Sequence, residues 1–245
     1  MDRRNISLRE EVVLVPGASG ALGRKVVSAI VQRGGNVVAG CHRNREKLSG
    51  FVKERELQQR VVTVEGDLKN SSVRRNYIEA ALKKWGRLDG LVDCSGIPCR
   101  TSLDLIESKE ISSIFDANSF GPLLLARDVA KEIIRLKSWG SVVHISSQHA
   151  LSLTAGREIY ALSKLLLSHF NRMLARQYPS VQFNEIVLGA IGIGMSSATK
   201  INYPNHIVSL TQVISAILYL LDKDASEGLT GSVLRLDKGF SLPYI

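Results

Sequence analysis

Tyr160 and Lys164 are the two residues of this sequence whose types and spacing most clearly suit chemistry. Residues four positions apart lie on one face of a helix, so the phenol and the ammonium group are expected in the same cleft. Conversion of a carbonyl to an alcohol needs a hydride on carbon and a proton on oxygen, and a phenol donates that proton near neutral pH only beside a cation. The spacing therefore predicts Tyr160 as a general acid and Lys164 as its supporting cation.

A glycine-rich turn over residues 17–23 (GASGALG) provides a second chemical signal. It follows an apolar run typical of a strand and precedes an amphipathic helical pattern. Glycine lets the backbone approach a pyrophosphate closely, and the amides at a helix N-terminus attract negative charge. We therefore expect a dinucleotide phosphate site, with a purely structural loop as the alternative. The expected contacts are Gly17, Ser19, Gly20 and Leu22.

The next apolar run ends in His42 and Arg43, without the acidic residue that would accept the ribose hydroxyls of NAD. An arginine at this position pairs with a 2′-phosphate and stacks on adenine. The segment therefore favours NADPH over NADH, with Arg43 as the first choice for the phosphate contact. An exposed surface arginine is the alternative interpretation.

Seven short, mostly β-branched runs alternate with amphipathic helical patterns, which predicts a parallel sheet covered by helices on both faces. The expected strands are 12–15, 37–39, 61–64, 91–92, 142–145, 183–188 and 233–236. The expected helices are 21–32, 71–85, 108–136, 160–178 and 210–221. Because crossovers between parallel strands are right-handed, we expect an α/β, doubly wound sheet with its ligand crevice at the carboxyl ends of the strands.

Composition indicates one soluble domain spanning residues 1–245, because 44% of the residues are hydrophobic and no linker divides the chain. No apolar run reaches the roughly 18 residues that cross a bilayer. The three cysteines suggest neither a disulfide framework nor a metal site. The net charge of +9 is spread along the chain and matches no nucleic-acid-binding motif. We expect a cytoplasmic protein that binds no membrane, nucleic acid or metal.

The glycine turn, the Tyr-x-x-x-Lys pair and the closing segment 229–240 resemble the short-chain dehydrogenase/reductase family, most strongly its 3-oxoacyl-carrier-protein reductase-like branch. The resemblance covers residues 12–240 and implies a Rossmann-type fold. It also implies that Ser147 aligns the substrate oxygen, with neighbouring Ser146 as the alternative, and that Asn118 supports a proton relay behind Lys164. The implied catalytic set is Asn118, Ser147, Tyr160 and Lys164.

The resemblance also implies further contacts to the NADP(H) cofactor. Asp67 matches an adenine contact of the family, although a carboxylate at a helix N-terminus is the alternative. Lys164 would hold the nicotinamide ribose. The complete set beyond the phosphate turn is His42, Arg43, Asp67, Leu68, Ser95, Gly96, Tyr160, Lys164 and Ile191.

The sequence departs from the family pattern in the cofactor segments. Pro16 and Ala21 replace a threonine and a glycine of the phosphate turn, and only the glycine of the family's Asn-Asn-Ala-Gly segment is kept in Asp93-Cys94-Ser95-Gly96. Leu188 and Ile193 stand where the family has proline and threonine. A short stretch, 196–208, remains for a substrate lid, which predicts a more open or differently closed site.

These observations predict NADPH-dependent reduction of a ketone to a secondary alcohol, with a 3-oxoacyl thioester on a carrier protein as one candidate substrate. A cofactor-binding partner subunit or sensor with weak or no catalysis is the alternative, and alcohol oxidation uses the same residues in reverse. The resemblance implies a homo-oligomer, a dimer or tetramer built through the two long helices. Apolar residues of the second long helix suit either that interface or packing on the sheet: Leu165, Leu166, Leu167, Phe170 and Leu174.

Overall fold

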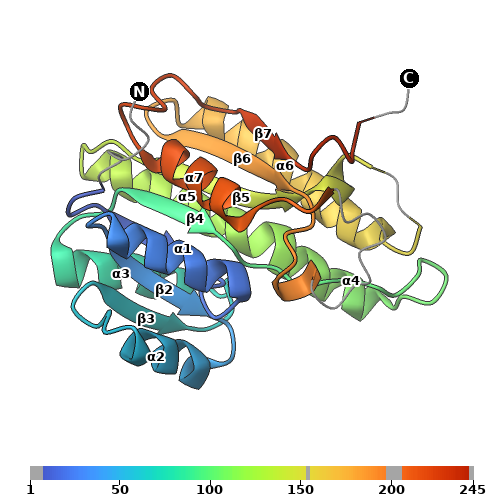
Figure 1. Ribbon diagram of the computed structural model, residues 1–245, viewed down its shortest axis with the longest axis horizontal. Helices are drawn as coiled ribbons and strands as arrows, with labels where there is room; N and C mark the ends of the chain where they lie inside the picture. Colours follow the sequence, from blue (N-terminus) through green and yellow to red (C-terminus); the bar gives the residue numbers. More distant parts are fainter. Residues whose placement is uncertain (1–7, 153–154, 197–205, 243–245) are drawn as a thin grey trace.

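The computed structural model describes residues 8–152, 155–196 and 206–242, which pack around one seven-stranded sheet (Figure 1). The strand order is β3-β2-β1-β4-β5-β6-β7, and every neighbouring pair is parallel. This is the doubly wound, Rossmann-type sheet that the sequence predicts. The strands are β1 Val12–Val15, β2 Asn36–Cys41, β3 Val61–Glu65, β4 Gly90–Asp93, β5 Ser141–Ser147, β6 Gln182–Leu188 and β7 Val233–Leu236.

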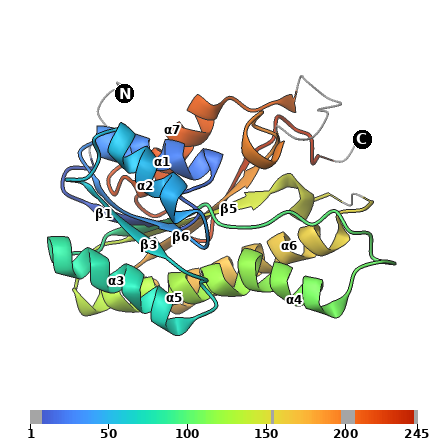
Figure 2. The ribbon, with the colours of Figure 1, turned by 90° about the horizontal axis from the view of Figure 1, so that it is seen from below.

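Helices cover both faces of the sheet, as Figure 2 shows. Apolar residues of α1, α2 and α7 pack on one face, and those of α3, α5 and α6 pack on the other. Within the described residues, no helix is long and apolar enough to cross a membrane. The helices are α1 Ala21–Gln32, α2 Arg45–Glu54, α3 Ser71–Trp85, α4 Ser108–Phe115, η1 Asp116–Phe120, α5 Gly121–Arg135, η2 Gln148–Ala150, α6 Glu158–Gln177, η3 Gly194–Ser196 and α7 Leu210–Leu221.

The strands are short and rich in β-branched residues because helices bury both of their faces, although β5 and β6 also contain buried polar side chains such as His144 and Glu185. Every residue of β1, β2, β4, β5 and β6 is buried. At the edge of the sheet, β7 remains partly exposed. The loops that follow the central strands therefore project from the carboxyl edge of a buried sheet.

The helix expected over 108–136 is continuous from α4 through η1 to α5, but its middle turn is not α-helical. The η1 segment is a wider π turn, in which the Gly121 amide donates to the Asp116 carbonyl five residues earlier. Pro122 follows directly and has no N–H to offer, which favours a change in the hydrogen-bond pattern at this point. The π turn includes Asn118, so it sets the direction of that side chain.

Helix α2 is absent from the sequence-based expectation. Only Leu48 and Val52 of this helix are buried, and the remaining residues are polar, charged or only partly buried. The apolar residues Leu48, Phe51 and Val52 have helical spacing but cover little more than one turn, which is too short a signal to identify a ten-residue helix. Tertiary packing against the sheet stabilises it instead.

Candidate active site

A large cavity of about 1200 Å³ opens at the carboxyl ends of the central strands. This is where a doubly wound sheet binds its ligands, and the volume suits a dinucleotide together with a small substrate. Of the residues expected at the site, the cavity is lined by Gly17, Ser19, Gly20, Leu22, His42, Arg43, Asp67, Leu68, Ser95, Gly96, Ser147, Tyr160, Lys164 and Ile191. Asn118 is the one expected residue outside this lining, because it is fully buried behind it.

The turn after β1 has the geometry of a phosphate cradle. Gly17 has a φ of +75°, and a Cβ at this position would lie 2.4 Å from the Cys94 carbonyl oxygen. Gly20 is the N-cap of α1 and brings no side chain to the first turn of that helix. The amides of the first helical turn are thus presented to the cavity at the positive end of the helix dipole. These residues fit the pyrophosphate of a dinucleotide.

Helix α6 positions Tyr160 and Lys164 on its first two turns. Lys164 is 3% exposed, and its Nζ donates to the Ile145 carbonyl at 3.1 Å. This bond fixes the ammonium at the end of β5. Tyr160 is half-buried, and its ring meets the His149 ring edge-on with 6.0 Å between centroids. The two side chains predicted to share a cleft therefore do line the same cavity.

Asn118 connects the π turn to the loop that follows β4. Its Oδ1 accepts from the Ile97 amide at 2.7 Å, and its Nδ2 donates to the Ile97 carbonyl at 3.0 Å and to Ser163 Oγ at 3.1 Å. A Cβ on neighbouring Gly96 would lie 3.1 Å from Asn118 Oδ1 and 3.5 Å from Lys164 Nζ. Asn118 therefore fixes the path of the 96–97 backbone beside the lysine, and glycine keeps that space open.

Two adjacent serines end β5 in different surroundings. Ser147 Oγ accepts from the His149 amide at 3.3 Å, which leaves its hydroxyl proton available to a ligand in the cavity. Ser146 Oγ is buried and has no hydrogen-bond partner among the described residues. Both residues line the cavity, so the structure leaves Ser147 and Ser146 as neighbouring candidates.

Asp93 stands where the family pattern has asparagine, and it braces the loop below the cavity. Its Oδ1 accepts from both the amide and the hydroxyl of Ser95, and its Oδ2 lies 3.4 Å from His144 Nδ1. Although burial favours the neutral carboxyl, the hydrogen bond and charge of His144, together with the Lys164 ammonium, hold the pKa of Asp93 below its ordinary value. The charged form of Asp93 is thus stabilised within the fold.

The adenosine end of the cavity has charged residues on the loops after β2 and β3. His42 Nε2 lies 3.8 Å from an Asp67 carboxylate oxygen, which also pairs with Lys69 Nζ at 3.6 Å. The N-cap of α3 is Asn70, so Asp67 does not cap that helix. Arg43 is exposed and lines the cavity, as a 2′-phosphate contact requires.

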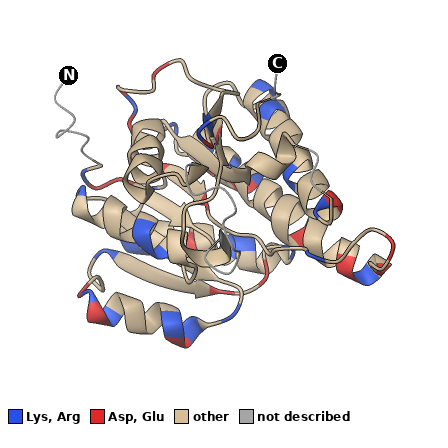
Figure 3. Ribbon diagram, turned by 45° about the vertical axis from the view of Figure 1, so that its right-hand side comes forward, with Lys and Arg blue, Asp and Glu red and all other residues tan. Residues whose placement is uncertain are grey.

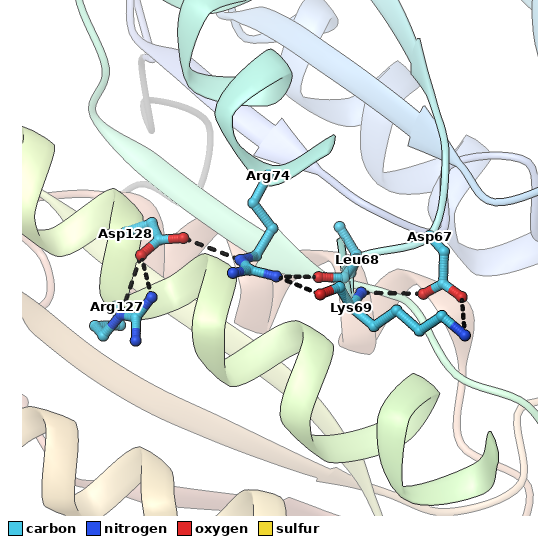
Figure 4. Close-up of polar contacts among 6 residues, drawn as sticks. All are labelled: Asp67, Leu68, Lys69, Arg74, Arg127 and Asp128. Carbon is cyan, nitrogen blue, oxygen red and sulfur yellow. Dashed lines mark hydrogen bonds and ion pairs between the residues drawn. The ribbon is translucent and has the colours of Figure 1, made fainter. Parts of the chain in front are cut away.

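Arg74 anchors the turn that presents Asp67 and Leu68, as Figure 4 shows. Its buried guanidinium donates to the Leu68 and Lys69 carbonyls at 2.6 and 3.0 Å, and to Asp128 Oδ2 at 3.0 Å. Because Asp128 belongs to α5, this one side chain ties the cofactor end of β3 to the helix that continues from the π turn. Charge-assisted bonds in a buried setting give the turn a defined position.

Sequence reasoning missed several basic residues of the cavity, namely Arg100, Lys109 and Arg157. A signal was available for Arg157, which precedes Tyr160 by three residues and so lies one helical turn away. Arg100 and Lys109 come from the loop after β4 and the start of α4, and only the folded chain places them here. Most of the expected lid, 197–205, lies outside the described residues.

Comparison with known proteins identifies the family. The model of the short chain dehydrogenase family matches residues 11–203. The chain is 27% identical over 254 residues to L-xylulose reductase of Caenorhabditis elegans, covering 97% of this chain and 98% of that protein. It is 24% identical over 245 residues to a 3-oxoacyl-[acyl-carrier-protein] reductase of Thermotoga maritima, covering 95% and 98%.

A solved structure shares the fold along the same length. A variant of actinorhodin polyketide ketoreductase, crystallised with NADPH, superposes with a TM-score of 0.87 at 19% identity, covering 96% of this chain and 98% of that one. The family match covers more than half of the chain, and its phosphate turn and Tyr-Lys pair lie in the cavity described above. This protein belongs to the short-chain dehydrogenase family of oxidoreductases.

Proposed function

We propose that this protein reduces a ketone to a secondary alcohol with NADPH. The observation that carries the proposal is the placement of Tyr160 and Lys164 in the same cavity as the glycine turn after β1. This arrangement brings a proton donor, a cation and a pyrophosphate cradle within one site. The names of its relatives, an L-xylulose reductase and a 3-oxoacyl-[acyl-carrier-protein] reductase, support the reductive direction.

The residues of the chain have separate tasks in this proposal. When bound, the cofactor supplies the hydride. Tyr160 donates the proton to the carbonyl oxygen, and Ser147 holds that oxygen by donating a hydrogen bond. Lys164 stabilises the resulting phenolate with its positive charge. The Ile145 carbonyl holds the ammonium group at the cavity. Asn118 keeps the 96–97 backbone in place beside this group.

The proposed preference for NADPH rests on the β2 end of the cavity. Arg43 is exposed there, and the carboxylate of Asp67 is already engaged by His42 and Lys69. A 2′-phosphate suits a guanidinium, whereas the ribose hydroxyls of NADH need an acceptor. The NADPH-bound ketoreductase of the same fold agrees with this choice.

Turnover by the Tyr160→Phe variant is the decisive measurement. Oxidation of NADPH and NADH is followed against acetoacetyl thioesters and a panel of small ketones. We expect NADPH-dependent turnover in the wild type, and a loss of about 100-fold or more in the variant because the general acid is removed. Tyr219→Phe is the control, since Tyr219 is 39% exposed on α7 and does not line the cavity.

A cofactor-binding partner or sensor is the second candidate function. It is favoured by the altered residues Pro16, Ala21 and Ile193, all of which lie at or beside the cavity. Calorimetric titration with NADPH separates the two functions. Tight binding without turnover of any carbonyl would favour the sensor, whereas binding with Tyr160-dependent turnover would exclude it.

A further inference from the structure

Arg157 places a guanidinium group in the wall of the cavity at the start of α6. It is the N-cap residue of that helix and is only partly exposed. One nitrogen donates to the Cys99 carbonyl at 3.3 Å, which draws the side chain toward the loop after β4. Within residues 8–152, 155–196 and 206–242, no carboxylate lies within ion-pair distance of it. Most of its donors are therefore not used within the described part of the fold.

The guanidinium of Arg157 and the phenol that donates the proton line the same cavity. Arg157 has non-helical dihedrals and precedes Tyr160, in the first turn of α6, by three residues. The ring of Tyr160 contacts that of His149. Burial, and then the positive charge of Arg157, lower the pKa of His149, which indicates that the guanidinium lies near this imidazole. Arg157, His149 and Tyr160 thus line the same cavity.

The charge balance of the cavity also favours an anion. Arg100 and Lys109 line the cavity as exposed cations. Asp67 and Asp116 are the only carboxylates in its described lining, and Asp67 is engaged by His42 and Lys69. A positive, partly desolvated wall stabilises a negative ligand much more strongly than bulk water does.

We propose that Arg157 binds an anionic group of the substrate, so that the enzyme selects carbonyl compounds carrying a carboxylate or a phosphate a few bonds from the carbonyl. This inference rests on the proposed function, because it concerns the substrate of the same site. The guanidinium matches the two oxygens of either anion in a bidentate contact. The exposed cations Arg100 and Lys109 attract the charged substrate to the cavity.

Paired substrates test this subsite directly. 4-Oxopentanoate is compared with its methyl ester, and dihydroxyacetone phosphate with dihydroxyacetone. In the wild type we expect kcat/KM to be about 10- to 100-fold higher for the anion of at least one pair, and Arg157→Gln to remove that preference. The pair that shows the preference identifies the anion as carboxylate or phosphate.

Two further variants separate charge from structure. Arg157→Lys keeps the charge and should retain part of the preference, while Arg172→Gln removes an exposed charge of α6 outside the cavity and should retain all of it. An unchanged Tm and an unchanged affinity for NADPH in Arg157→Gln show that the variant is still folded. Equal kcat/KM for anion and neutral partner in both pairs would overturn the inference and leave the reductase proposal standing.

Binding provides a measurement that does not depend on turnover. Calorimetric titration of 4-oxopentanoate and dihydroxyacetone phosphate, in the presence of NADP⁺, is compared between the wild type and Arg157→Gln. At least one anion should bind the wild type, and its affinity should fall about 10-fold or more in the variant. If no ketone is reduced, the proposed function fails, and this titration still decides the subsite. Identical affinities for both anions, or no binding of either, would contradict it.

Discussion

Ser147 and Ser146 are adjacent in sequence, yet they occupy different environments at the end of β5. Both residues are buried, but Ser147 Oγ accepts from the His149 amide, whereas Ser146 Oγ has no partner in the described chain. A hydroxyl that already accepts one bond is oriented to donate another. This hydrogen bond is the reason for proposing Ser147, rather than Ser146, as the group that aligns the substrate oxygen.

Replacement of Ser147 by alanine tests this choice. We expect Ser147→Ala to lower kcat/KM about 100- to 1000-fold, because the variant lacks one donor to the oxygen on which charge develops. Ser146→Ala should lower it less than about 10-fold, and it should not lower the Tm, since the lost hydroxyl makes no hydrogen bond. The reverse order of the two effects would assign the alignment to Ser146.

The turn between β2 and α2 positions Arg43, the residue proposed to contact the 2′-phosphate. Asn44 has a φ of +71°, a left-handed conformation that asparagine tolerates better than most residues. It reverses the chain directly after Arg43 and begins α2. Arg43 is consequently left exposed at the rim of the cavity, while Arg45 in the helix pairs with Glu65 at 4.0 Å.

Cofactor preference at this turn is measured with Arg43→Ala. We expect kcat/KM for NADPH to fall about 10- to 100-fold, because a charge-assisted contact to the 2′-phosphate is lost, with little change for NADH. Steady-state kinetics with both cofactors check the result. Arg55→Ala, an exposed arginine just after α2, is the control and should leave the ratio unchanged. An unchanged ratio in Arg43→Ala would exclude this residue from cofactor selection.

At the scale of the whole molecule, basic residues outnumber acidic ones, which gives a net charge of +9. Lys and Arg lie on several separate helices with Asp and Glu between them, as Figure 3 shows. Several acidic residues lie near Glu11, just before β1. Beyond the effect of burial, the negative charge of Asp89 raises the pKa of Glu11, and the charges of Asp222 and Asp224 raise it less. Burial, together with these negative charges, raises the pKa of Glu11 to about 7, and Arg87 opposes the shift.

This raised pKa predicts a pH-dependent loss of stability. A carboxyl with a higher pKa in the folded state binds its proton more tightly there, so its contribution is lost as pH rises from about 4.5 to about 7. Glu11→Gln removes the loss. Because Glu11 is only partly buried, we expect a gain of about 1–2 kcal/mol at pH 8, equivalent to about 2–8 °C in Tm.

Thermal unfolding at pH 4.5 and pH 8 measures this effect. The Tm of Glu11→Gln should equal that of the wild type near pH 4.5, where the wild-type carboxyl is protonated in the folded state. Glu54→Gln, which replaces an exposed residue of α2, should match the wild type at both values. An equal gain for Glu11→Gln at both pH values would show that protonation of this carboxyl does not govern stability.

The exposed apolar residues of α6 bear on assembly. Leu167 and Leu174 pack on the sheet, but Leu162, Leu165 and Met173 remain exposed along the helix. Of the five positions that the sequence left undecided, Leu167, Phe170 and Leu174 pack against the core, Leu165 is exposed and Leu166 is partly exposed. We retain a homo-oligomer as a proposal, for which the exposed side chains of α6 supply an apolar surface.

The sequence determined the sheet, most of the helices and the central residues of the site. Short β-branched runs, amphipathic periods and the Tyr-x-x-x-Lys spacing are local signals, so they can be identified without knowledge of distant contacts. Helix α2 was not predicted because its three apolar residues cover little more than one turn. The π turn was not predicted because a hydrogen bond to the carbonyl five residues earlier, instead of four, leaves no clear signal in the composition.

Only the tertiary structure decided which distant residues meet. In-register pairing of β4, β5 and β6 places Asp93 beside His144 and His144 beside Glu185, all fully buried, although these neighbours are far apart in sequence. Similarly, Arg157 reaches the loop after β4 and faces the cavity through the crossing of α6. Strand register and helix packing determine such encounters, because they depend on how the whole core is filled rather than on any local pattern.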